Sequence, residues 1–110
     1  MRVLVCGGRY YDGWSSVHKT LIQIKPTVVI QGGAPGADRL AAKWADINAV
    51  PLVTYPALWH QGKKGGPMRN SFMLKDSRPD LVIAFPGGDG TDDMVRKAES
   101  AGVKILRVLS

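Results

Sequence analysis

Short runs of consecutive apolar residues recur along the chain. The strongest lie at residues 2–6, 27–31 and 81–85, and two more lie at residues 52–55 and 103–108. Runs that are rich in β-branched residues and lack polar alternation are typical of strands buried on both faces of a parallel sheet. The pattern therefore predicts five strands.

Between these runs, apolar residues recur at the spacing of one helix face. Pro67 suits the first position of the third predicted helix, and Gly102 suits the end of the last one. We predict helices near residues 14–24, 35–48, 67–76 and 91–101, and a loop over residues 56–66.

The alternation of strands and helices predicts an α/β fold of the Rossmann-like kind. It would have three layers, with a mostly parallel five-stranded sheet and helices on both faces. The 110 residues have room for one core, and no linker or low-complexity segment divides them. Residues 1–110 are therefore expected to form a single domain.

Three of the predicted strands end at a pair of glycines: Gly7–Gly8, Gly32–Gly33 and Gly87–Gly88. In a parallel sheet these ends lie on one edge, where open α/β sheets bind ligands. Glycine lets a ligand approach the main-chain N–H groups closely. The repetition predicts a site for a phosphate-bearing ligand at this edge.

The composition indicates which kinds of partner and which cellular compartment to expect. Fifteen basic and nine acidic side chains give a net charge of +6, which favours anionic partners such as a nucleotide or a nucleic acid. A single cysteine excludes an internal disulfide and fits a reducing, cytoplasmic location. We see no signal-peptide pattern and no stretch of membrane-spanning length, so no membrane partner is expected.

A homodimer through helix faces is also expected. A sheet covered on both sides leaves a small core in 110 residues, and three tryptophans are many for so small a domain. These tryptophans are Trp14, Trp44 and Trp59.

Residues 32–38 join the second strand to a helix, and their N–H groups and the helix dipole favour an anion. Gly36 and Asp38 fall near the start of that helix. Asp38 could simply stabilise the dipole, or it could accept a hydrogen bond from a ribose hydroxyl or a base. The sequence leaves these two roles open.

Residues 86–93 give the sharpest signal for binding. Pro86, Gly87, Gly88 and Gly90 crowd the space between a buried strand and a helix. Thr91 could cap this helix and also offer its hydroxyl to a ligand. A simple capped turn rarely needs so much glycine, so we favour a ligand site.

Residues 59–70 add charge and flat surfaces. Lys63 could close over an anion, Arg69 could hold a phosphate bidentately, and Asn70 could read polar edges. Trp59 or Tyr55 could stack on a base, although core packing explains either residue equally well.

Candidates for catalysis are few. His18 and His60 lack metal-ligand spacing, Cys6 is more typical of a small buried hydrophobe, and no Walker motif is present. We predict neither a metal nor a cofactor, and Arg69, Asp93 and Asp38 are only weak catalytic candidates.

Three segments resemble the YspA/YpsA-related branch of the SLOG superfamily, which is named for the DNA-processing Smf/DprA proteins and the cytokinin-activating Lonely Guy enzymes. The resemblance spans nearly the whole chain and implies a Rossmann-like fold that binds nucleotides or nucleotide-derived ligands. The segments are Gly32-Gly33-Ala34-x-Gly36-Ala37-Asp38, Trp59-x-x-x-Gly62-Lys63-x-x-Gly66-Pro67-x-Arg69-Asn70 and Ala84-Phe85-Pro86-Gly87-Gly88-x-Gly90-Thr91.

One position departs from the Lonely Guy pattern. The resemblance places the arginine of those enzymes at Arg69, but their glutamate, which helps to cleave an N-glycosidic bond, falls at Met94. Methionine cannot transfer a proton, and Asp93 is rotated by about 100° around the helix. Met94 also fits an apolar helix face with Val95 and Ala98.

We therefore predict a nucleotide-binding or sensor module with little or no catalysis. The alternatives are a nucleoside monophosphate phosphoribohydrolase and, ranked third, a protein that binds single-stranded nucleic acid as DprA-like proteins do. The predicted ligand-binding residues are Gly7, Gly8, Gly32, Gly33, Gly36, Asp38, Lys63, Arg69, Asn70, Pro86, Gly87, Gly88, Gly90 and Thr91.

Overall fold

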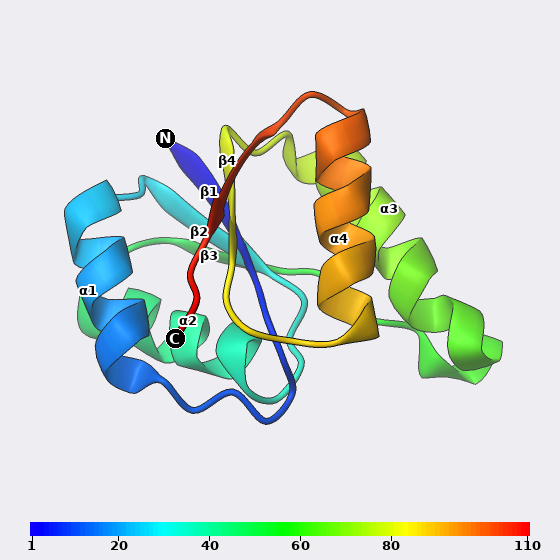
Figure 1. Ribbon diagram of the computed structural model, residues 1–110, viewed down its shortest axis with the longest axis horizontal. Coiled ribbons are helices and arrows are strands. Elements are labelled where there is room, and N and C mark those ends of the chain that lie inside the picture. Colours follow the sequence, from blue (N-terminus) through cyan, green and yellow to red (C-terminus); the bar gives the residue numbers. More distant parts are fainter.

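Helices and strands follow one another along the whole chain. The computed structural model describes the backbone of residues 1–110 and every side chain except those of residues 59 and 61. The elements in chain order are β1 (Arg2–Cys6), α1 (Trp14–Ile24), β2 (Val28–Gln31), α2 (Ala37–Ile47), β3 (Leu52–Thr54), the 3₁₀ helix η1 (Trp59–Lys64), α3 (Gly65–Ser77), β4 (Leu81–Ala84), α4 (Asp89–Ser100) and β5 (Lys104–Arg107) (Figure 1).

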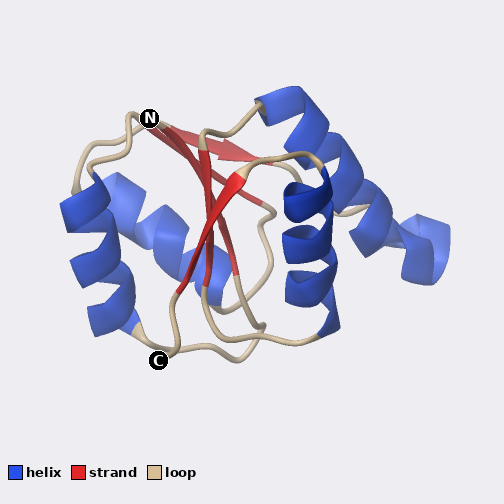
Figure 2. Ribbon diagram, turned by 45° about the horizontal axis from the view of Figure 1, so that its top comes forward, coloured by secondary structure: helices blue, strands red, loops and turns tan.

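The strands form a single parallel sheet in the order β3-β2-β1-β4-β5. Helices α1 and α2 cover one face, and α3 and α4 cover the other (Figures 1 and 2). The predicted α/β, Rossmann-like architecture is confirmed, and the sheet is parallel throughout.

Strand β1 shows why the apolar runs lack polar alternation. Val3 and Val5 pack into the core under α1 and α2, whereas Leu4 and Cys6 pack into the core under α3 and α4. Burying one such aliphatic side chain contributes about 1.5–3 kcal/mol, so a strand that serves two cores cannot spare positions for polar residues.

The connections reverse direction at the middle of the sheet. From β1 the chain moves outward through β2 to β3, then crosses to β4 on the other side of β1 and continues to β5. The loops after β1 and β4 therefore diverge, and a crevice opens between them at the carboxyl ends of the strands. This crevice is where the fold favours a ligand.

Two boundaries differ from the sequence-based expectation. Residues 59–64 form η1 instead of a loop, and α3 begins at Gly65, ahead of Pro67. Helix α4 begins at Asp89 with Gly88 as its N-cap, so Thr91 lies inside the helix and does not cap it. In both helices, packing against neighbouring elements outweighs the low helix propensity of glycine.

The tryptophans are used inside the fold. Trp44 is buried in the first core, and its Nε1 donates a hydrogen bond to Nδ1 of His18 at 3.2 Å. Trp14 packs against the same core, with Nζ of Lys43 4.8 Å from its ring centre. Two of the three residues that suggested an interface therefore have a structural role, and the homodimer stays a prediction.

Within the described part of the chain, the longest α-helix is α3, with 13 residues. No described helix has both the length and the apolar character needed to cross a bilayer.

Candidate functional site

A cleft of about 740 Å³ opens where the loops after β1 and β4 diverge. This volume lies within the range of small-ligand pockets. Its walls come from four places: residues 5–11 after β1, Ala34 and Asp38 near the start of α2, the η1–α3 segment, and residues 86–93 at the start of α4. Of the predicted ligand-binding residues, all line this cleft except Gly32, Gly33 and Gly36.

The three glycine segments converge, as expected from a parallel sheet. The N–H of Gly8 donates to the carbonyl oxygen of Pro86 at 2.8 Å, and the N–H of Ala37 donates to that of Gly8 at 3.1 Å. The backbone after β1 is thus tied to the loop after β4 on one side and to the start of α2 on the other.

Much of the glycine in these segments serves packing. A Cβ on Gly7 would lie 2.5 Å from Cβ of Ala37, and one on Gly87 would lie 2.7 Å from the backbone nitrogen of Gly8. Gly36 has a φ of +80° and would press a side chain against the carbonyl oxygen of Gly8. These glycines are required by the close approach of three backbones, whether or not a ligand binds.

Gly88 and Gly90 are different. A Cβ at either position would meet no heavy atom within 4 Å, and neither residue has a positive φ. No neighbouring heavy atom would block a side chain at either position, and both residues line the cleft. We call residues 87–91 the open turn.

The open turn leaves main-chain donors facing the cleft. Gly88 caps α4 with its backbone, and no side chain caps the first turn of the helix. The first helical bond runs from the N–H of Asp92 to the carbonyl oxygen of Gly88. The preceding N–H groups, with the positive end of the helix dipole, form a site that favours an anion.

Residues 32–38, which we call the closed loop, already hold an anion of their own. The Oδ2 atom of Asp38 accepts hydrogen bonds from the N–H groups of Gly32 at 3.1 Å and Ala34 at 3.2 Å. Asp38 is buried, and this burial raises its pKa, although these hydrogen bonds and the charge of Arg69 act in the opposite direction. Its carboxylate thus fills the position that an external phosphate would take.

Arg69 braces the closed loop from the other side. Its Nη1 donates to the carbonyl oxygens of Gly32 at 2.7 Å and Tyr55 at 3.2 Å. Burial lowers the pKa of Arg69, whereas the Asp38 carboxylate raises it. Arg69 lies on α3, within the helix predicted for residues 67–76, and it is half-buried and engaged with the protein.

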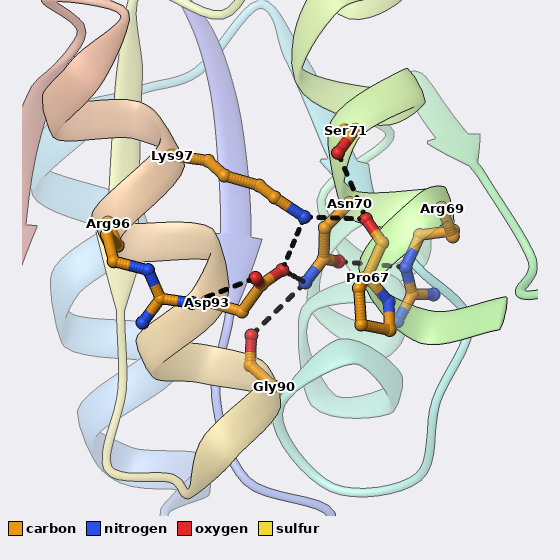
Figure 3. A network of polar contacts seen from close by, with 8 residues as sticks. All are labelled: Pro67, Arg69, Asn70, Ser71, Gly90, Asp93, Arg96 and Lys97. Atoms are coloured by element: carbon orange, nitrogen blue, oxygen red, sulfur yellow. Dashed lines mark hydrogen bonds and ion pairs between the residues drawn. The ribbon is translucent and has the colours of Figure 1, made fainter. Parts of the chain in front are cut away.

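Asn70 connects Arg69 to α4 (Figure 3). Its Oδ1 accepts from Nε of Arg69 at 2.9 Å, and its Nδ2 donates to the carbonyl oxygen of Gly90 at 3.2 Å and to Oδ2 of Asp93 at 3.0 Å. Both the oxygen and the nitrogen of this buried side-chain amide therefore form hydrogen bonds within the protein. Asn70 places the open turn against α3.

Asp93 is held by cations on its own helix. Nζ of Lys97 lies 2.8 Å from its Oδ2, and Nη2 of Arg96 lies 3.1 Å from its Oδ1. Burial alone would raise the pKa of Asp93, but the hydrogen bonds from Lys97 and Asn70 and the two positive charges hold it below its usual value. Lys97 also donates to the carbonyl oxygen of Pro67, which fastens α3 to α4.

Two further positions considered for catalysis, Met94 and Cys6, are buried. Met94 is fully buried in the core under α3 and α4, which confirms the packing role predicted for it. Burial, together with the nearby Asp38 carboxylate, raises the pKa of the Cys6 thiol to about 12, so this thiol stays protonated. Among the described residues, no group of three or more potential metal ligands comes together.

Tyr55, one of the two residues expected to stack on a base, does not line the cleft. The hydroxyl of Tyr55 donates to Oδ2 of Asp76 at 2.6 Å, and its ring meets that of Phe72 edge to face. The side chain of Trp59 lies outside the described residues. The cleft instead presents Arg9, Tyr10 and Tyr11, which were not among the predicted ligand-binding residues. Their position directly after a Gly-Gly strand end was the available signal.

A parallel sheet in the order β3-β2-β1-β4-β5, with a glycine-lined cleft at its reversal point, defines the class of Rossmann-like α/β domains. Within this class, the family described as "YspA, cpYpsA-related SLOG family" (YAcAr) matches residues 1–62, and the chain belongs to it. The matched segment includes the closed loop and ends before α3 and the open turn.

Two similar proteins place this family membership in context. The chain is 35% identical to the Gene 61 protein of Mycobacterium phage D29 over an alignment of 119 residues, which covers 96% of this chain and 94% of that protein. It also superposes on DNA processing protein A (DprA) from Streptococcus pneumoniae with a TM-score of 0.57 and 20% identity. That match covers 96% of this chain but 58% of the DprA chain, and it shows a shared fold.

Proposed function

We propose that this protein binds a nucleotide or a nucleotide-derived small ligand in the cleft, with a phosphate group against the open turn, and that it acts as a binding module or sensor. The observation that carries the proposal is the pair Gly88 and Gly90. No contact with a neighbouring heavy atom requires glycine at either position, and the missing side chains leave room on the cleft wall. A ligand that approaches the backbone closely explains both.

The charges around the cleft support an anionic ligand that also offers polar groups. Arg9 and Lys63 line the cleft from two different segments of the chain and are exposed. Asp89, in the first turn of α4, opposes a phosphate placed directly beside it but can accept a hydrogen bond from a hydroxyl group. A sugar phosphate supplies both kinds of group, whereas inorganic phosphate supplies only the anion.

Turnover has little support from the carboxylates of the site. Met94 stands where the Lonely Guy enzymes carry their glutamate, and it is buried. Asp93 is paired with Lys97 and Arg96, and Asp38 is bonded to the closed loop. General acid–base catalysis, which is typically worth about 10²–10⁴-fold, needs a group that can reach the substrate. We therefore propose binding without N-glycosidic cleavage.

The test is calorimetric titration of the full chain with adenosine monophosphate, comparing the natural protein with Gly90→Ala. Alanine at position 90 should reduce affinity at least tenfold by filling the space beside the open turn. It should leave the melting temperature unchanged or slightly raised, because alanine favours a helix over glycine by about 0.5–1 kcal/mol. Ser100→Ala, at the far end of α4, is the matched control.

A natural protein that binds no nucleotide would contradict the proposal. Equal affinity in Gly90→Ala would remove the open turn from the site even if binding occurred. Chromatographic detection of free adenine in the same samples tests the absence of turnover, and mass spectrometry of molecules that co-purify with the protein extends the search beyond adenosine monophosphate.

A further inference from the structure

Tyr10 holds its ring in solvent at the mouth of the cleft. It lines the cleft, yet 95% of its surface is exposed. An exposed tyrosine on a mobile tail would need no explanation. Tyr10, however, lies on a segment whose backbone is fixed on both sides.

The anchors of this segment are main-chain hydrogen bonds and one packed ring. Gly8 is tied to Pro86 and Ala37, and its carbonyl oxygen also accepts the N–H of Tyr11 at 3.2 Å. The ring of Tyr11 stacks on Phe85, with 5.3 Å between the ring centres. The backbone carrying Tyr10 is therefore held in place while the Tyr10 ring is left uncovered.

The two neighbouring tyrosines thus have different environments. Tyr11 packs against the first core, and its hydroxyl donates to the carbonyl oxygen of Ser110 at 2.9 Å. Within the described part of the chain, Tyr10 has no hydrogen bond and no aromatic partner. Tyr11 accounts for the stability of the segment, so Tyr10 is free to serve a ligand.

We propose that Tyr10 is the residue that recognises the base, by stacking on the flat face of a nucleobase whose phosphate lies at the open turn. This inference rests on the proposed function. The open turn is close enough for one ligand to reach both groups, because Gly8, two residues before Tyr10, would place a Cβ 3.1 Å from Cα of Gly87. Stacking of a base on an aromatic side chain is worth about 1–3 kcal/mol.

Stacking also predicts what the site selects. Every nucleobase has a π-face, so Tyr10 would favour ligands that carry a base over those that carry only a sugar phosphate, with weak preference among bases. Arg9, next in the chain and also on the cleft wall, supplies a positive charge beside the ring. The ligand class is therefore a nucleoside phosphate with an intact base.

The experiment titrates the full chain with adenosine monophosphate and with ribose 5-phosphate, which lacks the base. Tyr10→Ala should weaken binding of adenosine monophosphate about 5- to 150-fold and leave binding of ribose 5-phosphate unchanged. Tyr10→Phe keeps the ring and should bind both like the natural protein. Phe72→Ala, which removes a 60% exposed aromatic side chain outside the cleft, is the matched control.

The outcomes separate this inference from the proposed function. Unchanged affinity of Tyr10→Ala for adenosine monophosphate would overturn the stacking role and leave the proposed function standing. An equal loss of affinity for both probes would also overturn the stacking role, because Tyr10 would then act on the phosphate or on the conformation of the loop. Absence of binding by the natural protein to either probe would overturn both proposals together.

Discussion

The closed loop and the open turn look alike in the sequence but differ in the structure. Each follows a buried strand, begins with Gly-Gly and leads into a helix. In the closed loop, the Asp38 carboxylate accepts hydrogen bonds from the N–H groups of Gly32 and Ala34, and Arg69 donates one to the carbonyl oxygen of Gly32. Neither α2 nor α4 has a side-chain cap, but in the open turn Gly88 and Gly90 face empty space.

The difference shows that glycine density alone does not locate a ligand. In the closed loop, a buried carboxylate satisfies the donors that would otherwise attract an anion. In the open turn, the donors stay available and the backbone stays bare. A glycine that the fold does not require is the more informative one.

The same substitution in the two segments should have the most unequal effect on stability. Gly36→Ala places a side chain at a φ of +80° and against the backbone of Gly8 and Arg9. We expect a loss of about 3 kcal/mol or more, and a melting temperature lowered by more than about 10 °C. Gly90→Ala should not lower it. Thermal denaturation of both variants measures this difference. Similar losses of stability at both positions would contradict the distinction between the closed loop and the open turn.

Removing the internal anion should have the next largest effect. Asp38→Ala leaves the N–H groups of Gly32 and Ala34 without their acceptor and Arg69 without its neighbouring negative charge. We expect the free energy of unfolding to fall by about 2–4 kcal/mol in urea denaturation. Asp38→Asn, which keeps one acceptor oxygen, should lose less. If Asp38→Ala kept full stability but lost nucleotide binding, Asp38 would be a ligand residue instead.

The carboxylates of Asp38 and Asp93 should respond to pH in opposite directions. The pKa of Asp93 lies below the ordinary value of 3.8, so its contribution is present above that pH and is lost as pH falls through the folded-state pKa. The pKa of Asp38 is raised, so the folded state gains relative stability as pH falls from neutral through its folded-state pKa toward 3.8.

Urea denaturation between pH 3 and pH 7 separates these two contributions. The stability difference between the natural protein and Asp93→Asn should shrink on acidification. The corresponding difference for Asp38→Asn should instead move in favour of the natural protein on acidification. Parallel pH profiles for the two variants would show that the environments of the two carboxylates do not differ as described.

The smallest expected effect concerns Asp89 beside the open turn. Asp89→Asn removes an exposed negative charge near the proposed phosphate and should raise the affinity for adenosine monophosphate about two- to fivefold at low salt. The gain should fade as salt rises. Asp46→Asn, on the exposed surface of α2, serves as the charge-matched control. A lower affinity in Asp89→Asn would mean that the ligand uses this carboxylate as an acceptor.

Sequence alone predicted the parts of the molecule that depend on local pattern. The apolar runs located all five strands, and the periodicity that predicted helices near residues 14–24 and 35–48 located α1 and α2 closely. The Gly-Gly strand ends pointed to the edge of the sheet where the cleft lies. These features depend on short-range spacing and on the general geometry of parallel sheets.

Other features depend on contacts between distant segments, and no local pattern reveals them. Arg69 binds a carbonyl group 37 residues away, and Asn70 joins residues on two helices. The orientation of Tyr10 depends on which of two adjacent tyrosines meets Phe85. Such choices are set by tertiary packing, so the sequence could name candidates but not assign their roles.

The amide of Asn70 has a consequence for the motions of the molecule. Through it, Arg69 at the closed loop and Gly90 at the open turn share one link on α3. Any fluctuation that lifts α3 from α4 would break the Asn70 link and loosen both segments together, so the bonded amide protons of Gly32 and Ala34 in the closed loop would exchange with solvent in the same event. A ligand held at the open turn would then slow exchange in the closed loop, without touching it.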